Sequence, residues 1–161
     1  MGRATFPSKQ WVENRREVIN ARMNDLNFFG AALEHTPLRE QFWPAYEGLA
    51  DTLLSLKQAI IICMEANETS DTGKSAWLDA ARRHVRHAAL HLFLLLQDPL
   101  TRQSVQDRRL EVARLHQLRR RAAESHAGLE AAWDALLKGY EDMFENIRLA
   151  HVAHPTGGMD Q

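Results

Sequence analysis

The chain has 161 residues, which suits one domain with a core of its own. Hydrophobic residues make up 45% and charged residues 25%, which excludes a chain disordered over most of its length. The formal net charge is −1, and no apolar segment is long enough for a signal peptide or a membrane span, so we expect a cytoplasmic protein without membrane contact.

The first predicted helix begins after Ser8, a favourable N-cap residue that follows Pro7. We expect it to end near residues 34–37. Thr36 would then cap the next helix, and Pro37 would take the first helical position, where proline is favoured. Steps of three, four or seven residues define an inward apolar stripe at Val12, Ile19, Met23, Leu26 and Leu33.

Pro44 divides the second helical region, because proline removes a backbone hydrogen bond and clashes with the preceding turn. We expect a short helix over residues 37–43 and a longer one over residues 44–67. Cys63 is the only cysteine, so it excludes an internal disulfide and a zinc site built on several thiolates. Its apolar surroundings predict a buried structural thiol. The inward stripe of this region consists of Leu49, Leu53, Leu56, Ile60 and Cys63.

A third helix is predicted over residues 75–97, capped by Ser75 and stopped by the Asp-Pro pair at 98–99. A long helical stretch follows over about residues 101–154. We favour a break near Gly128, because one unbroken helix would extend ~75 Å, too long for this domain. Its inward ladder is Leu115, Leu118, Ala122, Leu129, Trp133, Leu136, Tyr140, Met143 and Ile147.

These segments predict an all-α fold, an antiparallel bundle of four to five long helices. We expect residues 1–161 to form a single domain, with residues 1–7 and 155–161 flexible. Apolar positions extend beyond one inward stripe in segments such as residues 92–97. Helices covered on more than one side would explain this pattern, so a homo-oligomer is expected.

Three histidines, His84, His87 and His91, follow the spacing of one helical face. On a helical wheel they lie between an apolar face and the side that carries Arg83 and Arg86. We favour the hypothesis that this border packs against another helix or subunit. A metal site at the three histidines is an alternative, since imidazoles three or four residues apart can chelate an ion. The segment "HAALH" resembles one part of the hemerythrin pattern, which implies a histidine-based metal-binding four-helix bundle, but the further ligands of that family are not reproduced.

An Arg-x4-His spacing occurs at Arg82–His87 and at Arg86–His91. It resembles the motif of HEPN-family ribonucleases, which are all-α. The resemblance implies metal-independent RNA cleavage with Arg82, Arg86, His87 and His91 as catalytic residues. Histidine exchanges protons near neutral pH, and arginine stabilises the charge of the transition state. The family motif allows four to six residues between the arginine and the histidine, and such pairs arise elsewhere in this arginine-rich chain, for example at Arg109–His116, so the spacing does not by itself identify a nuclease.

Positive charge concentrates between residues 82 and 121, where ten arginines stand against three acids for a net charge of +7. Residues 1–81 carry −3 and residues 122–161 carry −5. We favour pairing of residues 107–121, which we call the basic segment, with the acidic residues at 122–145, and keep a nucleic acid or another polyanion as an alternative partner. The candidate polyanion-binding residues are Arg109, Arg114, Arg119, Arg120 and Arg121.

The sequence therefore predicts a non-enzymatic helical interaction or regulatory module that needs no cofactor. We expect it to act on a protein partner or on a second copy of itself through helical surfaces. A HEPN-like ribonuclease is the first alternative, and a histidine-based metal-binding bundle is the second. Fold alone cannot choose among them, because helical bundles carry many functions.

Overall fold

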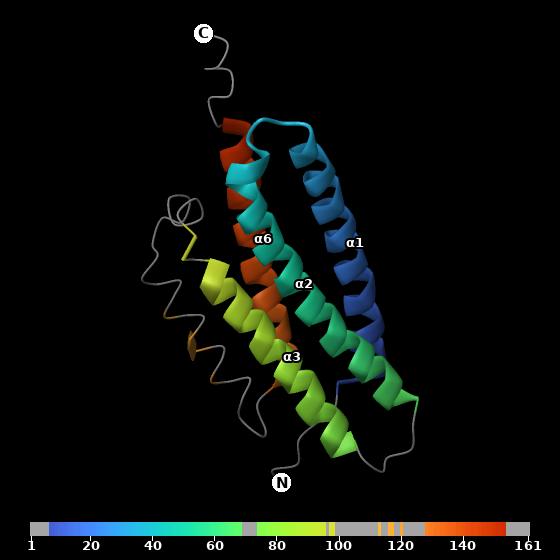
Figure 1. Ribbon diagram of the computed structural model, residues 1–161. Helices are drawn as coiled ribbons and strands as arrows, with labels where there is room; N and C mark the ends of the chain where they lie inside the picture. Colours follow the sequence, from blue (N-terminus) through green and yellow to red (C-terminus); the bar gives the residue numbers. More distant parts are fainter. Residues whose placement is uncertain are drawn as a thin grey trace.

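The computed structural model describes residues 7–68, 74–95, 97–98 and 128–153, together with the single residues 113, 116, 117 and 120. These residues form four helices and no strand (Figure 1): α1 (Lys9–Glu34), α2 (Arg39–Asn67), α3 (Lys74–Leu95) and α6 (Leu129–Ala153). The predicted all-α bundle is confirmed. Within these described parts, none of the helices combines the length and the apolar character needed to cross a membrane.

Helix α1 begins and ends where the sequence predicts. The Ser8 hydroxyl accepts a hydrogen bond from the Trp11 backbone N–H at 3.1 Å, which satisfies one of the free donors of the first turn. The helix ends at Glu34. Its predicted stripe faces the core: Val12, Ile19, Leu26 and Leu33 are buried, and Met23 is half-buried.

Helix α2 starts differently from the prediction. Leu38, not Thr36, is its N-cap residue, and it gives no side-chain cap. The Thr36 hydroxyl instead donates to the Leu33 carbonyl oxygen at 3.2 Å, at the end of α1. The expected Thr36 cap, with Pro37 as the first helical residue, is therefore wrong. The Thr36 side chain therefore caps the C-terminal end of α1 and not the N-terminal end of α2.

The expected division of α2 at Pro44 is also wrong. One helix runs through this proline from Arg39 to Asn67. Pro44 and Glu40 are both exposed, so the Glu40 carbonyl group that loses its N–H partner lies on a face that water can reach. The proline also stands near the start of the helix, where only one preceding turn has to accommodate its ring.

Helix α2 packs closely against its neighbours on two sides. A Cβ atom added at Gly30 of α1 would lie 2.7 Å from the Tyr46 ring, and one added at Gly48 would lie 2.8 Å from Leu95 of α3. A larger residue at either position would force the end of that neighbouring side chain to shift. All five residues of the predicted α2 stripe are buried: Leu49, Leu53, Leu56, Ile60 and Cys63.

Helix α6 runs parallel to α1, a feature that the sequence did not indicate (Figure 1). Arg15 forms an ion pair with Asp134, and Arg22 forms one with Glu141, seven residues further along both helices. Two contacts in this register fix both the direction and the alignment of the pair. Antiparallel packing holds for α2 against α1 and against α3 (Figure 1).

Helix α3 includes Lys74, so Ser75 lies inside the helix and is not its N-cap. The helix ends at Leu95, two residues before the predicted end. The backbone N–H groups of Gln97 and Asp98 then donate to Leu94 and Leu95 at 2.9 and 3.1 Å, a closing turn just before the Asp-Pro pair. The predicted apolar face of this helix is buried: Ala81, Val85, Ala88, Leu92 and Leu95.

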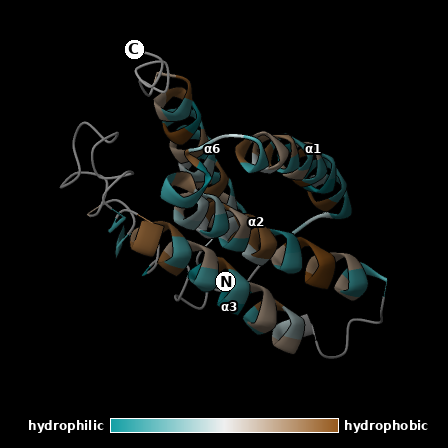
Figure 2. Ribbon diagram, turned by 45° about the horizontal axis from the view of Figure 1, so that its top comes forward, coloured by the Kyte–Doolittle hydropathy of each residue, from teal (hydrophilic) through white to brown (hydrophobic). Residues whose placement is uncertain are grey.

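Most of the predicted helical stretch over residues 101–127 lies outside the described residues, including the ladder positions Leu115, Leu118 and Ala122. The predicted break is confirmed at Gly128, which precedes α6 and accepts a hydrogen bond from the Ala132 N–H at 3.0 Å. The rest of the ladder is buried: Leu129, Trp133, Leu136, Tyr140, Met143 and Ile147. Each helix carries both hydrophilic and hydrophobic residues along its length, as amphipathic helices do (Figure 2).

Trp133 links three helices at the centre of the bundle. Its side chain is fully buried, and its Nε1–H donates a hydrogen bond to the Leu56 carbonyl oxygen of α2 at 3.0 Å. The Trp11 ring of α1 meets it edge to face, with ring centroids 5.5 Å apart. This tryptophan therefore contributes apolar burial and also satisfies its own polar group.

Replacing Trp133 with alanine should lower the free energy of unfolding by about 3–5 kcal/mol, because the change opens a large cavity and removes a buried donor. Trp43 is only half-buried and offers a matched control. Urea unfolding followed by circular dichroism measures both. A loss for Trp133→Ala no larger than that for Trp43→Ala would contradict the central position of Trp133.

Candidate functional site

The three histidines of α3 lie at the edge of its buried face, as the helical wheel predicts. His84 and His91 are half-buried, and His87 is exposed. The rings of His84 and His87 are nearly perpendicular, with centroids 5.9 Å apart. Burial lowers the pKa of His84, and the charges of His87 and Arg83 lower it further.

The metal hypothesis gains no support from the described part of the chain. Within it, no group of three or more His, Cys, Asp and Glu side chains is arranged to hold an ion. His84, His87 and His91 occupy one helical edge and span two turns. Further ligands would have to come from neighbouring helices, so this site stays a prediction.

The two Arg-x4-His pairs are not brought together within the chain. Arg82 is only 5% exposed and forms an ion pair with Asp79 at 3.8 Å, whereas His87 is exposed. Residues five apart on a helix point about 140° away from each other. The same divergence separates Arg86 from His91. The ribonuclease reading therefore stays a prediction that the geometry of a single chain does not favour.

The predicted polyanion-binding arginines fall mostly outside the described residues, namely Arg109, Arg114, Arg119 and Arg121. Arg120 is described; it is helical and exposed. One turn before it, the His116 ring lies 4.8 Å from the Phe93 ring, measured between centroids. Part of the basic segment therefore lies against α3.

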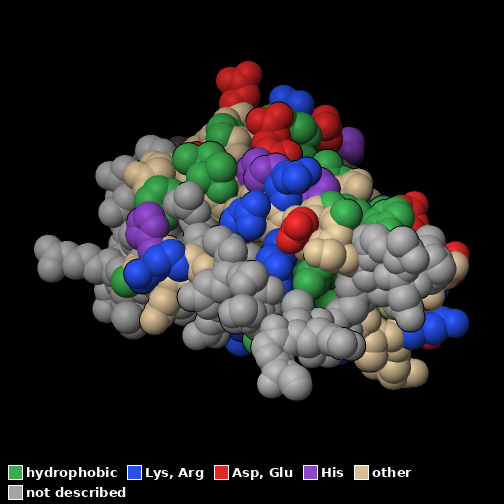
Figure 3. All heavy atoms as spheres, turned by 90° about the horizontal axis from the view of Figure 1, so that it is seen from below, with side chains coloured by type: hydrophobic (Ala, Val, Ile, Leu, Met, Phe, Trp, Pro, Cys, Tyr) green, Lys and Arg blue, Asp and Glu red, His purple; other side chains and the backbone are tan. Residues whose placement is uncertain are grey.

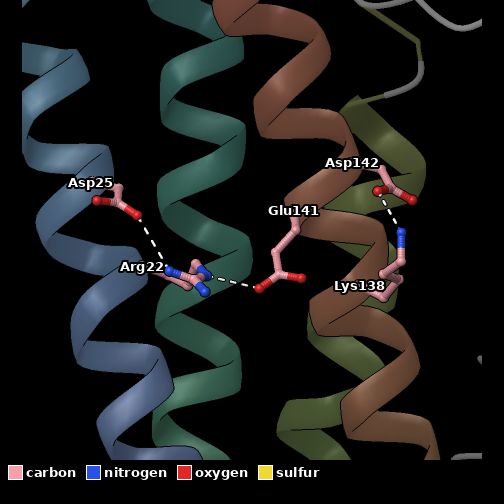
Figure 4. A network of polar contacts seen from close by, with 5 residues as sticks. All are labelled: Arg22, Asp25, Lys138, Glu141 and Asp142. Atoms are coloured by element: carbon pink, nitrogen blue, oxygen red, sulfur yellow. Dashed lines mark hydrogen bonds and ion pairs between the residues drawn. The ribbon is translucent and has the colours of Figure 1, made fainter.

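Two of the three arginines of α1, Arg15 and Arg22, form ion pairs with α6, and Figure 4 shows the second of them. Arg22 Nε donates to Glu141 at 2.7 Å and Nη1 to Asp25 at 3.3 Å. Arg15 binds Asp134 through two hydrogen bonds of 2.9 Å. These carboxylates raise the pKa of both guanidinium groups, mainly through the hydrogen bonds with Asp134 and Glu141.

This pairing differs from the expected one for two acids of the segment 122–145. The sequence favoured pairing of these acids with the basic segment at 107–121. Asp134 and Glu141 instead pair with arginines of α1. A charge count along the chain could not show this, because it does not include the direction in which α6 runs.

An apolar hollow of about 520 Å³ lies between α1 and α6, and we call it the α1–α6 groove. Phe28 beside it is 81% exposed, and Val152 is 69% exposed. The buried Phe29 ring meets the rings of Phe144 and His151 edge to face, with centroids 5.8 and 5.7 Å apart. Besides these five residues the groove is lined by Ala32, Asp25, Glu145 and Arg148. Sequence reasoning missed this site, since Phe28 follows no repeat that would mark it as exposed.

The groups with the largest pKa shifts lie in the core and not on a surface. Burial raises the pKa of Cys63 to about 12, and the charge of Glu130 adds to this. Burial also raises the pKa of Tyr140, whose side chain is fully enclosed. A thiol that stays protonated and shielded is not a nucleophile, so Cys63 is a structural residue, as the sequence predicted.

A scan of protein-family models finds none that matches the chain, and searches of curated proteins and of solved structures find no match either. The function has to be argued from the residues themselves. Two surfaces are candidates for binding a partner: the α1–α6 groove and the outer face of α3.

The raised pKa and the burial of Cys63 predict that the folded protein resists thiol reagents at pH 8. Reaction with Ellman's reagent should be slow for the native protein and should reach one thiol per chain after unfolding in urea. Rapid stoichiometric labelling of the native protein would show that the thiol is accessible and would contradict this description.

Proposed function

We propose that the protein is a non-enzymatic, cytoplasmic helical interaction module that associates with a second copy of itself through the α1–α6 groove. The observation that carries this proposal is Phe28, a large aromatic side chain with 81% of its surface exposed beside an apolar hollow. A contiguous apolar patch of this kind is costly to leave in water and typically marks an interaction site.

A second copy fits because the same surface holds both a protrusion and a hollow. Phe28 projects from α1, and the hollow beside it is about 520 Å³ in volume. A two-fold axis would bring Phe28 of each copy against the hollow of the other, which is the self-complementary contact of a symmetric dimer. An aromatic side chain inserted into an apolar pocket is also the usual anchor of a protein interface.

The charges around the groove are compatible with this arrangement. Asp25 lies on the α1 side, and Glu145 and Arg148 lie on the α6 side, where they share hydrogen bonds of 2.8 and 3.2 Å. Positively and negatively charged side chains therefore both lie along the edge of the groove. Two copies related by a two-fold axis can place opposite charges together, which favours the correct register.

The groove is also held in shape before any partner binds. The ion pairs Arg15–Asp134 and Arg22–Glu141 set the alignment of α1 with α6, and the Phe29–Phe144 contact closes the floor. A surface that is already ordered loses less conformational entropy on association than a flexible one.

Phe28→Glu should weaken self-association at least about tenfold, because it places a charge in the apolar contact. Sedimentation velocity over a wide range of protein concentration measures the effect. Leu94→Glu is the matched control: Leu94 is 53% exposed on α3, away from the groove, and its replacement should leave association unchanged. Circular dichroism should be the same for both variants and the wild type.

A wild-type protein that stays monomeric at every concentration would overturn the proposal. So would a dimer that Leu94→Glu disrupts and Phe28→Glu leaves intact. If the groove holds an amphipathic helix of another protein, Phe28→Glu would abolish that binding while the free protein remained a monomer, and the choice of a second copy would be wrong.

A further inference from the structure

The outer face of α3 gathers cationic and histidine side chains. Arg83 and His87 are exposed, and His84 and Arg86 are half-buried. Residues three or four apart are neighbours on a helix, so Arg83 lies beside Arg86 and His87, and His87 lies beside His84. We call these four residues the α3 basic surface. A space-filling view shows histidine and Lys or Arg side chains next to one another on one face of the molecule, with Asp or Glu side chains beside them (Figure 3).

Among the described residues, neither arginine of this surface forms an ion pair, although Asp79 lies one helical turn before Arg83. Asp79 is the one carboxylate of α3, and its ion pair is with the buried Arg82. No described carboxylate forms an ion pair with Arg83 or Arg86, whereas Arg15, Arg22 and Arg148 each hold one at 2.9 Å or less. Arg15 and Arg22 thus hold α1 to α6, whereas neither arginine of the α3 basic surface has an ion pair with a described residue.

A second cationic element lies close to the same surface. Phe93 is two turns along α3 from Arg86 and on the same side of the helix. Its ring contacts His116, and the exposed Arg120 follows His116 by one helical turn. This contact brings the turn that carries Arg120 to α3, although Arg120 follows Arg86 by more than 30 residues in the chain.

We propose that the α3 basic surface, together with Arg120, binds the phosphate backbone of a nucleic acid strand. Guanidinium groups bind phosphate oxygens through two parallel hydrogen bonds, and histidine adds a further donor when protonated. Several cationic groups along one surface fit a ligand with repeated charges better than a single anion. Contacts of this kind bind nucleic acids without reading their sequence. This inference does not depend on the α1–α6 groove or on self-association.

Fluorescence anisotropy with labelled RNA and DNA strands of the same mixed sequence tests the proposal. The wild type should bind at about 50 mM salt and weaken steeply by about 200 mM. The double variant Arg83→Gln/Arg86→Gln should bind at least about tenfold more weakly, and its dependence of log K on log salt should be shallower by about 1.5, since each lost phosphate contact removes about 0.7–0.9. Comparing the RNA and DNA arms shows which of the two strands is preferred.

The matched control is Lys9→Gln/Arg16→Gln, which removes two exposed cations of α1 and gives the same net charge. It should bind like the wild type. Equal weakening in both double variants would overturn the proposal, because general charge and not this surface would then explain binding. No binding by the wild type at low salt would also overturn it. Equally tight binding of labelled polyglutamate would do the same, since it would point to an acidic protein as the partner.

Discussion

The packing of α2 against three helices that run opposite to it is the constraint on which the rest of the fold depends. Its buried stripe contributes to one continuous core with residues of α1, α3 and α6. Gly30 and Gly48 leave room for the Tyr46 and Leu95 side chains, and the Leu56 carbonyl group accepts the Trp133 hydrogen bond. Because α1, α3 and α6 all run against α2, α1 and α6 meet as a parallel pair.

This parallel pairing gives Arg15 and Arg22 of α1 a different role from Arg83 and Arg86 of α3. Arg15 and Arg22 form ion pairs with Asp134 and Glu141, so their charges are neutralised within the fold and they attach α6 to α1. No such carboxylate faces Arg83 or Arg86 in the described parts of the chain. One side of the molecule therefore combines internal ion pairs with an apolar groove, and α3 presents two arginines that form no ion pair with the described residues. Both proposed binding surfaces follow from this distribution.

Periodicity in the sequence was sufficient to predict which residues are buried, since burial depends on helical spacing. The stripes of α1, α2 and α6 and the apolar face of α3 follow from it, whereas the break at Gly128 was predicted from helix length and from the low helix propensity of glycine. Periodicity defines a face but not a direction, so the parallel course of α6 and the Arg22–Glu141 pair could not be predicted. The errors at Thr36 and Pro44 have a local cause: each residue was judged alone, while its effect depends on which neighbours and how much water surround it. The exposure of Phe28 could not be predicted, because it depends on how α1 and α6 pack and not on the spacing of residues within α1.

Distances between spin labels measured by electron double resonance test the parallel pairing most directly. Labels would be placed at the exposed positions Glu13, Ala131 and Leu149, in a background in which Cys63 is replaced by alanine. Positions 131 and 149 are separated by about 27 Å along α6. A parallel α1–α6 pair predicts that the Glu13–Ala131 distance is shorter than the Glu13–Leu149 distance by roughly 15–20 Å. The reverse order would show that α6 runs antiparallel to α1 and would contradict the ion-pair register and the groove built on it.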